Sequence, residues 1–112
     1  MIPLAALAAL ASSPSFAQSA NFTLVNNTDV NFAGLQVRRY GTPDWRPLVI
    51  SPLPVAPSAT GAVQFSDQEC AFDLQATLPD GRVVVWPRVN LCEAKVVTLN
   101  RSANGQLWVD YR

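Results

Sequence analysis

Carboxylates are the side chains of this sequence that could do acid–base chemistry. The 112-residue chain contains no histidine, so nucleophile–base triads built on histidine are excluded. Asp67 and Glu69 stand close together just before Cys70, and two neighbouring acids can act as a general acid and base. A carboxylate-based hydrolase using Asp67, Glu69 or Asp73 is therefore one alternative. Hydrogen bonding of these acids to the backbone of a turn is the favoured interpretation.

An oxygen-rich segment, Asn26-Asn27-Thr28-Asp29-Val30-Asn31, is the second candidate. Asp29 and the amide oxygens beside it are ligand types that calcium prefers, so a calcium-stabilised β module is another alternative. A plain turn between two strands is favoured. The chain also lacks a glycine-rich loop that could bind phosphate. Because it has no histidine and its two cysteines are expected to pair, it cannot form a metal site from histidine and cysteine side chains. We therefore predict no cofactor and no metal site.

The charges of the chain are balanced and scattered. Eight basic residues accompany eight acidic ones, whereas binding a phosphate backbone requires a concentrated basic face. Arg38-Arg39 is the only pair of adjacent basic residues, and a solvated end of a strand accounts for it. We expect one domain, no nucleic-acid partner, and a monomer.

The N-terminal segment resembles an export signal. Residues 2–11 are apolar and uncharged, and they are too few to span a bilayer, which needs about 20 apolar residues. Ser15-Phe16-Ala17 then provides small residues at the positions that a signal peptidase inspects. We predict a signal peptide over 1–17 and a periplasmic or secreted domain over 18–112, with no membrane span after cleavage. A cut after Ala20 is the alternative, and no basic residue precedes the apolar run.

Short runs of β-branched and aromatic residues, separated by turn residues, follow Ala20. This pattern is typical of an all-β sandwich. We predict an antiparallel, immunoglobulin-like or similar sandwich of seven to eight strands, with a proline-rich crossover loop between Ile50 and Gly61. The predicted strands are Asn21 to Asn26, Phe32 to Tyr40, Arg46 to Ile50, Ala62 to Ser66, Cys70 to Leu78, Arg82 to Arg88, Lys95 to Asn100 and Leu107 to Tyr111.

Pro79-Asp80-Gly81 predicts a hairpin between two of these strands. Asp80-Gly81 favours a two-residue type I′ turn. That turn would place the apolar residues of both strands on one face, with Phe72 opposite Val89.

The two cysteines are predicted to form a disulfide at the open end of this hairpin. An exported chain meets an oxidising compartment, and the two residues are too far apart for a Cys-x-x-Cys redox or zinc motif. The register places Cys70 opposite Leu91, one residue short of Cys92. A β-bulge near Pro87 would remove the mismatch, since proline in strands occurs mainly at bulges and edges.

The C-terminal hairpin has its own turn signal, Ala103-Asn104-Gly105. A two-residue loop would pair Leu99 with Asp110 and bury a carboxylate. A three-residue loop with Gly105 in the left-handed conformation pairs Leu99 with Val109 instead, so we predict a G1-bulge turn.

The outer face of the cysteine hairpin supplies the candidate binding residues. The predicted register sets Asp73 opposite Arg88, and Gln75 opposite Trp86, with all four side chains facing outward. An exposed indole beside a fixed ion pair could stack on a sugar ring or contact another protein. Trp108 lies between two core-facing residues and should also face outward. Asp73, Trp86, Arg88 and Trp108 are therefore the predicted binding residues.

Four short motifs resemble a group of small secreted alphaproteobacterial proteins, usually labelled by a Tat signal or as uncharacterised. The motifs are Phe22-Thr-Leu-Val-Asn-Asn-Thr28, Cys70-Ala-Phe-Asp-Leu74, Asp80-Gly81 and Val89-Asn-Leu-Cys92. The resemblance covers about residues 20 to 100 and implies export, one disulfide and a β-sandwich. It implies no activity, and this chain lacks the twin arginine of a Tat signal.

We therefore expect an exported binding or structural accessory module without catalytic activity. Its expected partner is an envelope protein or a glycan, contacted through the outer face of the cysteine hairpin.

Overall fold

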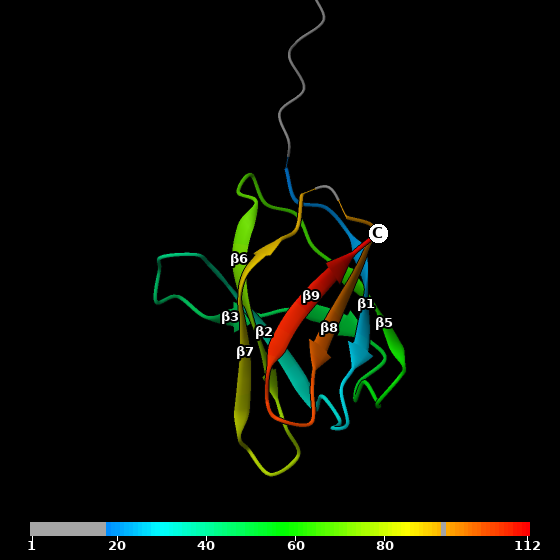
Figure 1. Cartoon of the computed structure of the whole chain (residues 1–112). Helices are drawn as coiled ribbons and strands as arrows, with labels where there is room; N and C mark the ends of the chain where they lie inside the picture. Colours follow the sequence, from blue (N-terminus) through cyan, green and yellow to red (C-terminus); the bar gives the residue numbers. More distant parts are fainter. Residues whose placement is uncertain (1–17, 93) are drawn as a thin grey trace, which may run out of the picture.

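The computed structural model describes residues 18–92 and 94–112 (Figure 1). The described residues form nine strands and no helix, so no helix among them could cross a membrane. The predicted signal peptide, residues 1–17, lies outside the described residues. The strands are β1 (Phe22–Asn27), β2 (Gly34–Arg39), β3 (Arg46–Pro47), β4 (Val49–Ser51), β5 (Thr60–Gln64), β6 (Ala71–Thr77), β7 (Val83–Asn90), β8 (Val96–Arg101) and β9 (Leu107–Tyr111).

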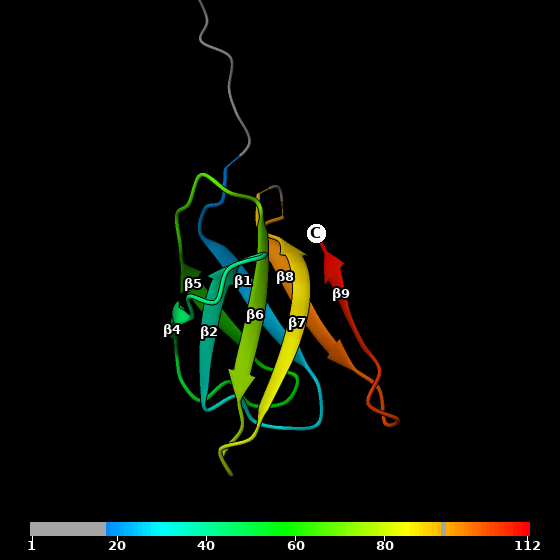
Figure 2. The same ribbon diagram turned by 90° about the vertical axis from the view of Figure 1, so that its left-hand side faces the viewer.

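The strands form two sheets that pack face to face (Figure 2). The five-stranded sheet has the order β4-β5-β1-β8-β9, and the four-stranded sheet has the order β3-β2-β6-β7. The all-β sandwich architecture is thus confirmed. One pair, β1 with β8, is parallel, so the sandwich is not wholly antiparallel. These two strands are far apart in the sequence, and no local pattern indicates that they are neighbours.

The extra strand arises because the predicted strand from Arg46 to Ile50 divides between the sheets. Arg46–Pro47 pairs with β2, whereas Val49–Ser51 pairs with β5. Leu48 lies at the crossing point, where its side chain is buried and its N–H donates to the Leu35 carbonyl at 3.0 Å.

The loop of the cysteine hairpin differs from the predicted type I′ turn. The Leu78 N–H donates to Arg82 O, and the Gly81 N–H donates to Leu78 O, at 2.8 and 2.9 Å. Gly81 has a φ of 89°. The loop is therefore the three residues 79–81, a type I turn closed by a glycine in the left-handed region. Pro79 explains the difference, because its fixed φ suits the second position of a type I turn.

This loop changes the register of β7 by one residue. Leu74 pairs with Trp86 and Ala76 with Val84, so Trp86 faces the core. The register then shifts between Phe72 and Leu74, and the predicted pairing of Phe72 with Val89 is restored. The two residues opposite this shift are Pro87 and Arg88, so a bulge lies near Pro87 as predicted. It offsets the one-residue change made by the loop, so Cys70 stays opposite Leu91, and the predicted alignment of Cys70 with Cys92 is wrong.

The predicted disulfide is confirmed beyond this bulge. Cys70 and Cys92 are bonded, with their Cα atoms 5.0 Å apart. Ser19 lies at the same end of the hairpin, where its hydroxyl donates to the Glu69 carbonyl at 2.6 Å and its N–H donates to Asp67 O at 2.8 Å. The disulfide end of the hairpin therefore also holds the N-terminal segment of the domain.

The C-terminal hairpin confirms the predicted G1-bulge turn. The Gly105 N–H donates to Ser102 O at 2.9 Å, and Gly105 has a φ of 87°. Leu99 pairs with Val109 as predicted.

Candidate binding surface between strands β7 and β9

Asp73 is an internal residue of the four-stranded sheet. It is only 3% exposed, and its carboxylate accepts hydrogen bonds from Arg38 Nε at 2.8 Å and from the Arg88 backbone N–H at 3.1 Å. The predicted side-chain ion pair between Asp73 and Arg88 is wrong, because the bulge presents the backbone of Arg88 to the carboxylate. Asp73 therefore anchors the bulge rather than facing a ligand.

The Arg88 side chain extends in another direction, toward the outer surface. Its Nη2 donates to the Tyr40 hydroxyl at 2.7 Å, and its guanidinium carbon lies 4.8 Å from the centre of the Tyr40 ring. Both side chains are exposed. Arg88 is thus a surface cation held in place by an aromatic ring.

Trp86 does not form the exposed platform predicted for it. The residue is 1% exposed, its Nε1–H donates to Asn100 O at 2.9 Å, and its ring packs edge-on against Phe32 at 5.7 Å. The one-residue change of register explains this, since a shift by one residue turns every side chain of a strand to the other face. Trp86 is a core residue that bridges the two sheets.

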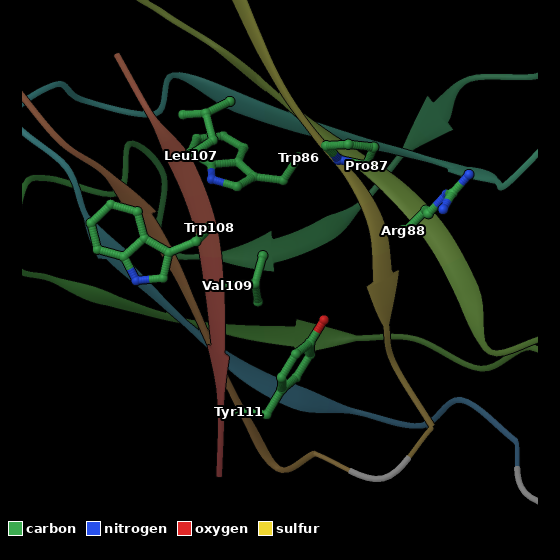
Figure 3. Close-up of a pocket in the computed structure, with 7 residues that line it drawn as sticks. All are labelled: Trp86, Pro87, Arg88, Leu107, Trp108, Val109 and Tyr111. Atoms are coloured by element: carbon green, nitrogen blue, oxygen red, sulfur yellow. The ribbon is translucent and has the colours of Figure 1, made fainter. Parts of the chain in front are cut away.

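Trp108 faces outward from β9, as predicted, and is 45% exposed. It belongs to the five-stranded sheet, whereas Trp86 belongs to the four-stranded sheet. The two tryptophans therefore do not share one sheet face. Arg88 and Trp108 instead lie on either side of the opening between the sheets (Figure 3).

This opening is a cleft of about 270 Å³ between β7 and β9, the edge strands on one side of the sandwich. Figure 3 shows Leu107, Val109 and Tyr111 on one side of β9 and Trp108 on the other. The Tyr111 hydroxyl accepts the Asn90 N–H at 3.0 Å and so connects β9 to β7. The cleft is lined by Trp86, Pro87, Arg88, Leu107, Trp108, Val109 and Tyr111.

The lining of the cleft suits binding. It combines apolar and aromatic side chains with one cation, and it contains no carboxylate. The binding residues predicted from the sequence do not include Leu107, Val109 and Tyr111. The alternation of side chains in this segment predicts the strand but not its part in a cleft. Their role depends on β9 being the last strand of its sheet, which no local sequence pattern reveals.

The predicted acid pair is divided between two environments. Asp67 accepts hydrogen bonds from Arg39 Nη2 at 2.9 Å and Arg46 Nη2 at 2.8 Å, and its side chain is 3% exposed. Glu69 is exposed and borders a depression of about 420 Å³. No second acid lines that depression among the described residues, so the structure does not bring Asp67 and Glu69 together as an acid–base pair.

The pKa of Asp67 is lowered from 3.8 to about 2. Burial of the carboxyl acts in the opposite direction and is the largest single influence, but hydrogen bonds from the Glu69 N–H, Arg39 and Arg46 together outweigh it. Asp67 is therefore charged throughout the physiological range and joins the N-terminal segment to β2 and β3.

We expect Asp67→Asn to remove the part of the free energy of unfolding that the wild type loses when Asp67 is protonated at low pH. Because the folded pKa lies below the unfolded one, the contribution of Asp67 is present above about pH 4 and is lost as the pH falls toward 2. The lowering of the Asp67 pKa corresponds to roughly 2 kcal/mol in the free energy of unfolding. Urea unfolding at pH 5 and at pH 2.5 should show a larger loss of stability for the wild type than for Asp67→Asn. Equal losses in the two proteins would contradict this role.

In the predicted calcium loop, the side-chain oxygens of Asn26 and Thr28 are used in internal hydrogen bonds. Asn26 is fully buried; its Oδ1 accepts hydrogen bonds from the Thr28 N–H and hydroxyl at 3.1 and 2.6 Å, and its Nδ2 donates to the Val30 and Val55 carbonyls. These contacts make an Asx turn. Within the described residues, no three acid, histidine or cysteine side chains form a group suited to a metal.

Comparison with solved structures supports the fold. The chain is similar to a protein from Eubacterium rectale whose structure was determined by NMR, with a TM-score of 0.53 and 16% sequence identity over 83% of this chain and 87% of that chain. At this identity the likeness shows the fold alone. No family model matches the chain, and no curated protein matches it. The two sheets and the core between them define the class of the protein as a two-sheet β-sandwich domain.

Proposed function

We propose that this domain is an exported, non-catalytic binding module that contacts a protein of the cell envelope through the cleft between β7 and β9. The carrying observation is the apolar and aromatic cleft at the open side of the sandwich, with the half-exposed Trp108 and Tyr111 beside it. Aromatic residues and arginine are the side chains most enriched where proteins bind one another. This cleft replaces the predicted outer face of the hairpin as the contact surface.

The state of the acidic residues supports a role in binding rather than catalysis. Asp67 is held by two arginines, and Asp73 is buried with both of its oxygens hydrogen-bonded. Neither is positioned to exchange a proton with a substrate in a cleft.

The disulfide between Cys70 and Cys92 is consistent with the proposed location outside the reducing cytoplasm. The contacts of Ser19 favour cleavage after Ala17 over the alternative cut after Ala20. A mature chain beginning at Gln18 keeps Ser19, whose buried hydroxyl bonds to the Glu69 carbonyl. The shorter product would lose this anchor.

Photo-crosslinking in the native envelope tests the proposed function. A benzophenone amino acid is placed at Gln106, an exposed position next to β9, or at Val49, an exposed position on β4 at the opposite edge of the same sheet. We expect an adduct with an envelope protein from position 106 and none from position 49. Trp108→Ala should weaken the adduct from position 106 several-fold, because it removes an exposed aromatic contact.

Two results would contradict the proposed function. One is the same set of adducts from both positions, which would indicate non-specific proximity. The other is the absence of any protein adduct at position 106. A glycan attached at position 106 in place of a protein would show that the partner class is wrong.

A further inference from the structure

Strand β9 is the least protected edge of the sandwich. The described strands leave four edges, β4 and β9 in one sheet and β3 and β7 in the other. Proteins commonly block such edges with proline, lysine or a bulge, because an open edge can pair with another strand. β3 contains Pro47, β7 contains Pro87 within its bulge, and β4 runs directly into Pro52. β9 contains no proline and no lysine, and it pairs with β8 without a register shift.

The hydrogen-bond pattern shows which backbone groups of β9 are open. Val96 and Arg112 exchange two hydrogen bonds, at 2.8 and 2.9 Å. Because bonded pairs alternate along an antiparallel ladder, the backbones of Trp108 and Asp110 also bond to β8. The N–H and carbonyl groups of Leu107, Val109 and Tyr111 therefore point away from β8. Within the described part of the chain, no hydrogen-bond acceptor meets these three N–H groups.

The same three residues also line the cleft, so the open edge and the cleft form one continuous surface. A strand added beside β9 would have alternate side chains facing the same way as Leu107, Val109 and Tyr111. Those side chains would enter the cleft toward Trp86 and Pro87. The added strand must therefore carry apolar residues at every second position. It must do so over about five residues, the length of β9.

The charges around this edge favour an acidic partner over a second copy of the chain. Arg88 lines the cleft, Arg101 pairs with Leu107, and Arg112 directly follows β9. Asp110, the one acid of β9, accepts a hydrogen bond from Asn100 Nδ2 at 3.1 Å. Two antiparallel β9 strands centred on Val109 would bring Arg112 of one copy to the end where Arg101 of the other lies. Repulsion at both ends disfavours that pairing.

We propose that β9 receives an extended segment of the envelope partner as a sixth strand of the five-stranded sheet. This proposal rests on the proposed function and specifies its mode of recognition. The segment has apolar side chains at alternate positions, which enter the cleft, and acidic residues at its ends, which meet the arginines. Backbone hydrogen bonds to Leu107, Val109 and Tyr111 provide its binding energy, as in other cases of strand addition.

Val109→Pro in the full chain tests this proposal. Proline removes an N–H that faces away from β8, so the ladder with β8 remains and the domain should fold. Val109→Ala is the matched control, because it shortens the side chain but keeps the N–H. With the benzophenone at Gln106, we expect the partner adduct to fall about tenfold or more in Val109→Pro. In Val109→Ala it should fall by a much smaller factor, because that variant loses only part of one side chain of the cleft and keeps the backbone N–H. Mass spectrometry of the crosslinked peptide should find alternating apolar residues with acidic flanks.

A second variant covers the case in which Val109→Pro fails to fold. Leu107→Pro removes another outward N–H at the first position of β9, where proline is tolerated in strands. A full-strength adduct in the folded proline variants would overturn strand addition while leaving the binding function in place. A crosslink between two copies of this chain would overturn the choice of partner. The absence of any protein adduct at position 106 of the otherwise wild-type chain would overturn both proposals.

Discussion

Trp86→Ala should destabilise the domain by about 3–5 kcal/mol, the usual cost of removing a large buried aromatic side chain. Trp86 is 1% exposed, contacts Phe32 and donates a hydrogen bond to the Asn100 carbonyl across the sandwich. A domain of this size has a total stability of roughly 5–15 kcal/mol. The substitution therefore removes a large part of the margin, and the variant should unfold at much lower urea concentrations.

Trp108→Ala is the matched control for Trp86→Ala. Trp108 is 45% exposed and lies on the outer side of β9, so its removal should change stability by less than about 1 kcal/mol. Urea unfolding followed by far-ultraviolet circular dichroism compares both variants without depending on tryptophan fluorescence. Similar stabilities for the two variants would mean that Trp86 does not occupy the core.

Removal of the disulfide should have the second largest effect. The bridge closes a loop with a sequence separation of 22 residues, and the loop-entropy estimate for such a closure is about 3 kcal/mol. It also lies beside the Ser19 contacts that hold the N-terminal segment. Cys70→Ala combined with Cys92→Ala should therefore lower the free energy of unfolding by about this amount.

The double alanine variant also provides its own control for chemical reduction. Urea unfolding with and without a thiol reductant should show a loss of stability in the wild type and no change in the variant. A wild type that is equally stable in its oxidised and reduced forms would contradict the assigned role of the bridge.

The two hairpins show how far local sequence determines register. For the C-terminal hairpin, a two-residue loop would have buried the Asp110 carboxylate, which excludes that loop length. The G1-bulge turn and the pairing of Leu99 with Val109 were therefore predictable. For the cysteine hairpin, Asp80-Gly81 is compatible with both a two-residue and a three-residue loop. The conformation of Pro79 decides between them. The resulting change of one residue moved Trp86 from the predicted surface into the core.

The cleft could not be predicted in the same way because it depends on contacts between distant segments. Trp108 was identified correctly as an outward-facing residue, and Arg88 as a surface residue. Their arrangement around one opening requires that β7 and β9 be the last strands of two different sheets. The parallel pairing of β1 with β8 helps to set that order, and it joins segments that no turn signal connects.

The comparison of photo-crosslinks from Gln106 and Val49 tests the central claim most directly, because these positions mark the two opposite edges of one sheet. If the open side of the sandwich is the binding surface, position 106 forms an adduct with an envelope protein and position 49 does not. Identical adducts from the two positions, or no protein adduct at position 106, would contradict the claim.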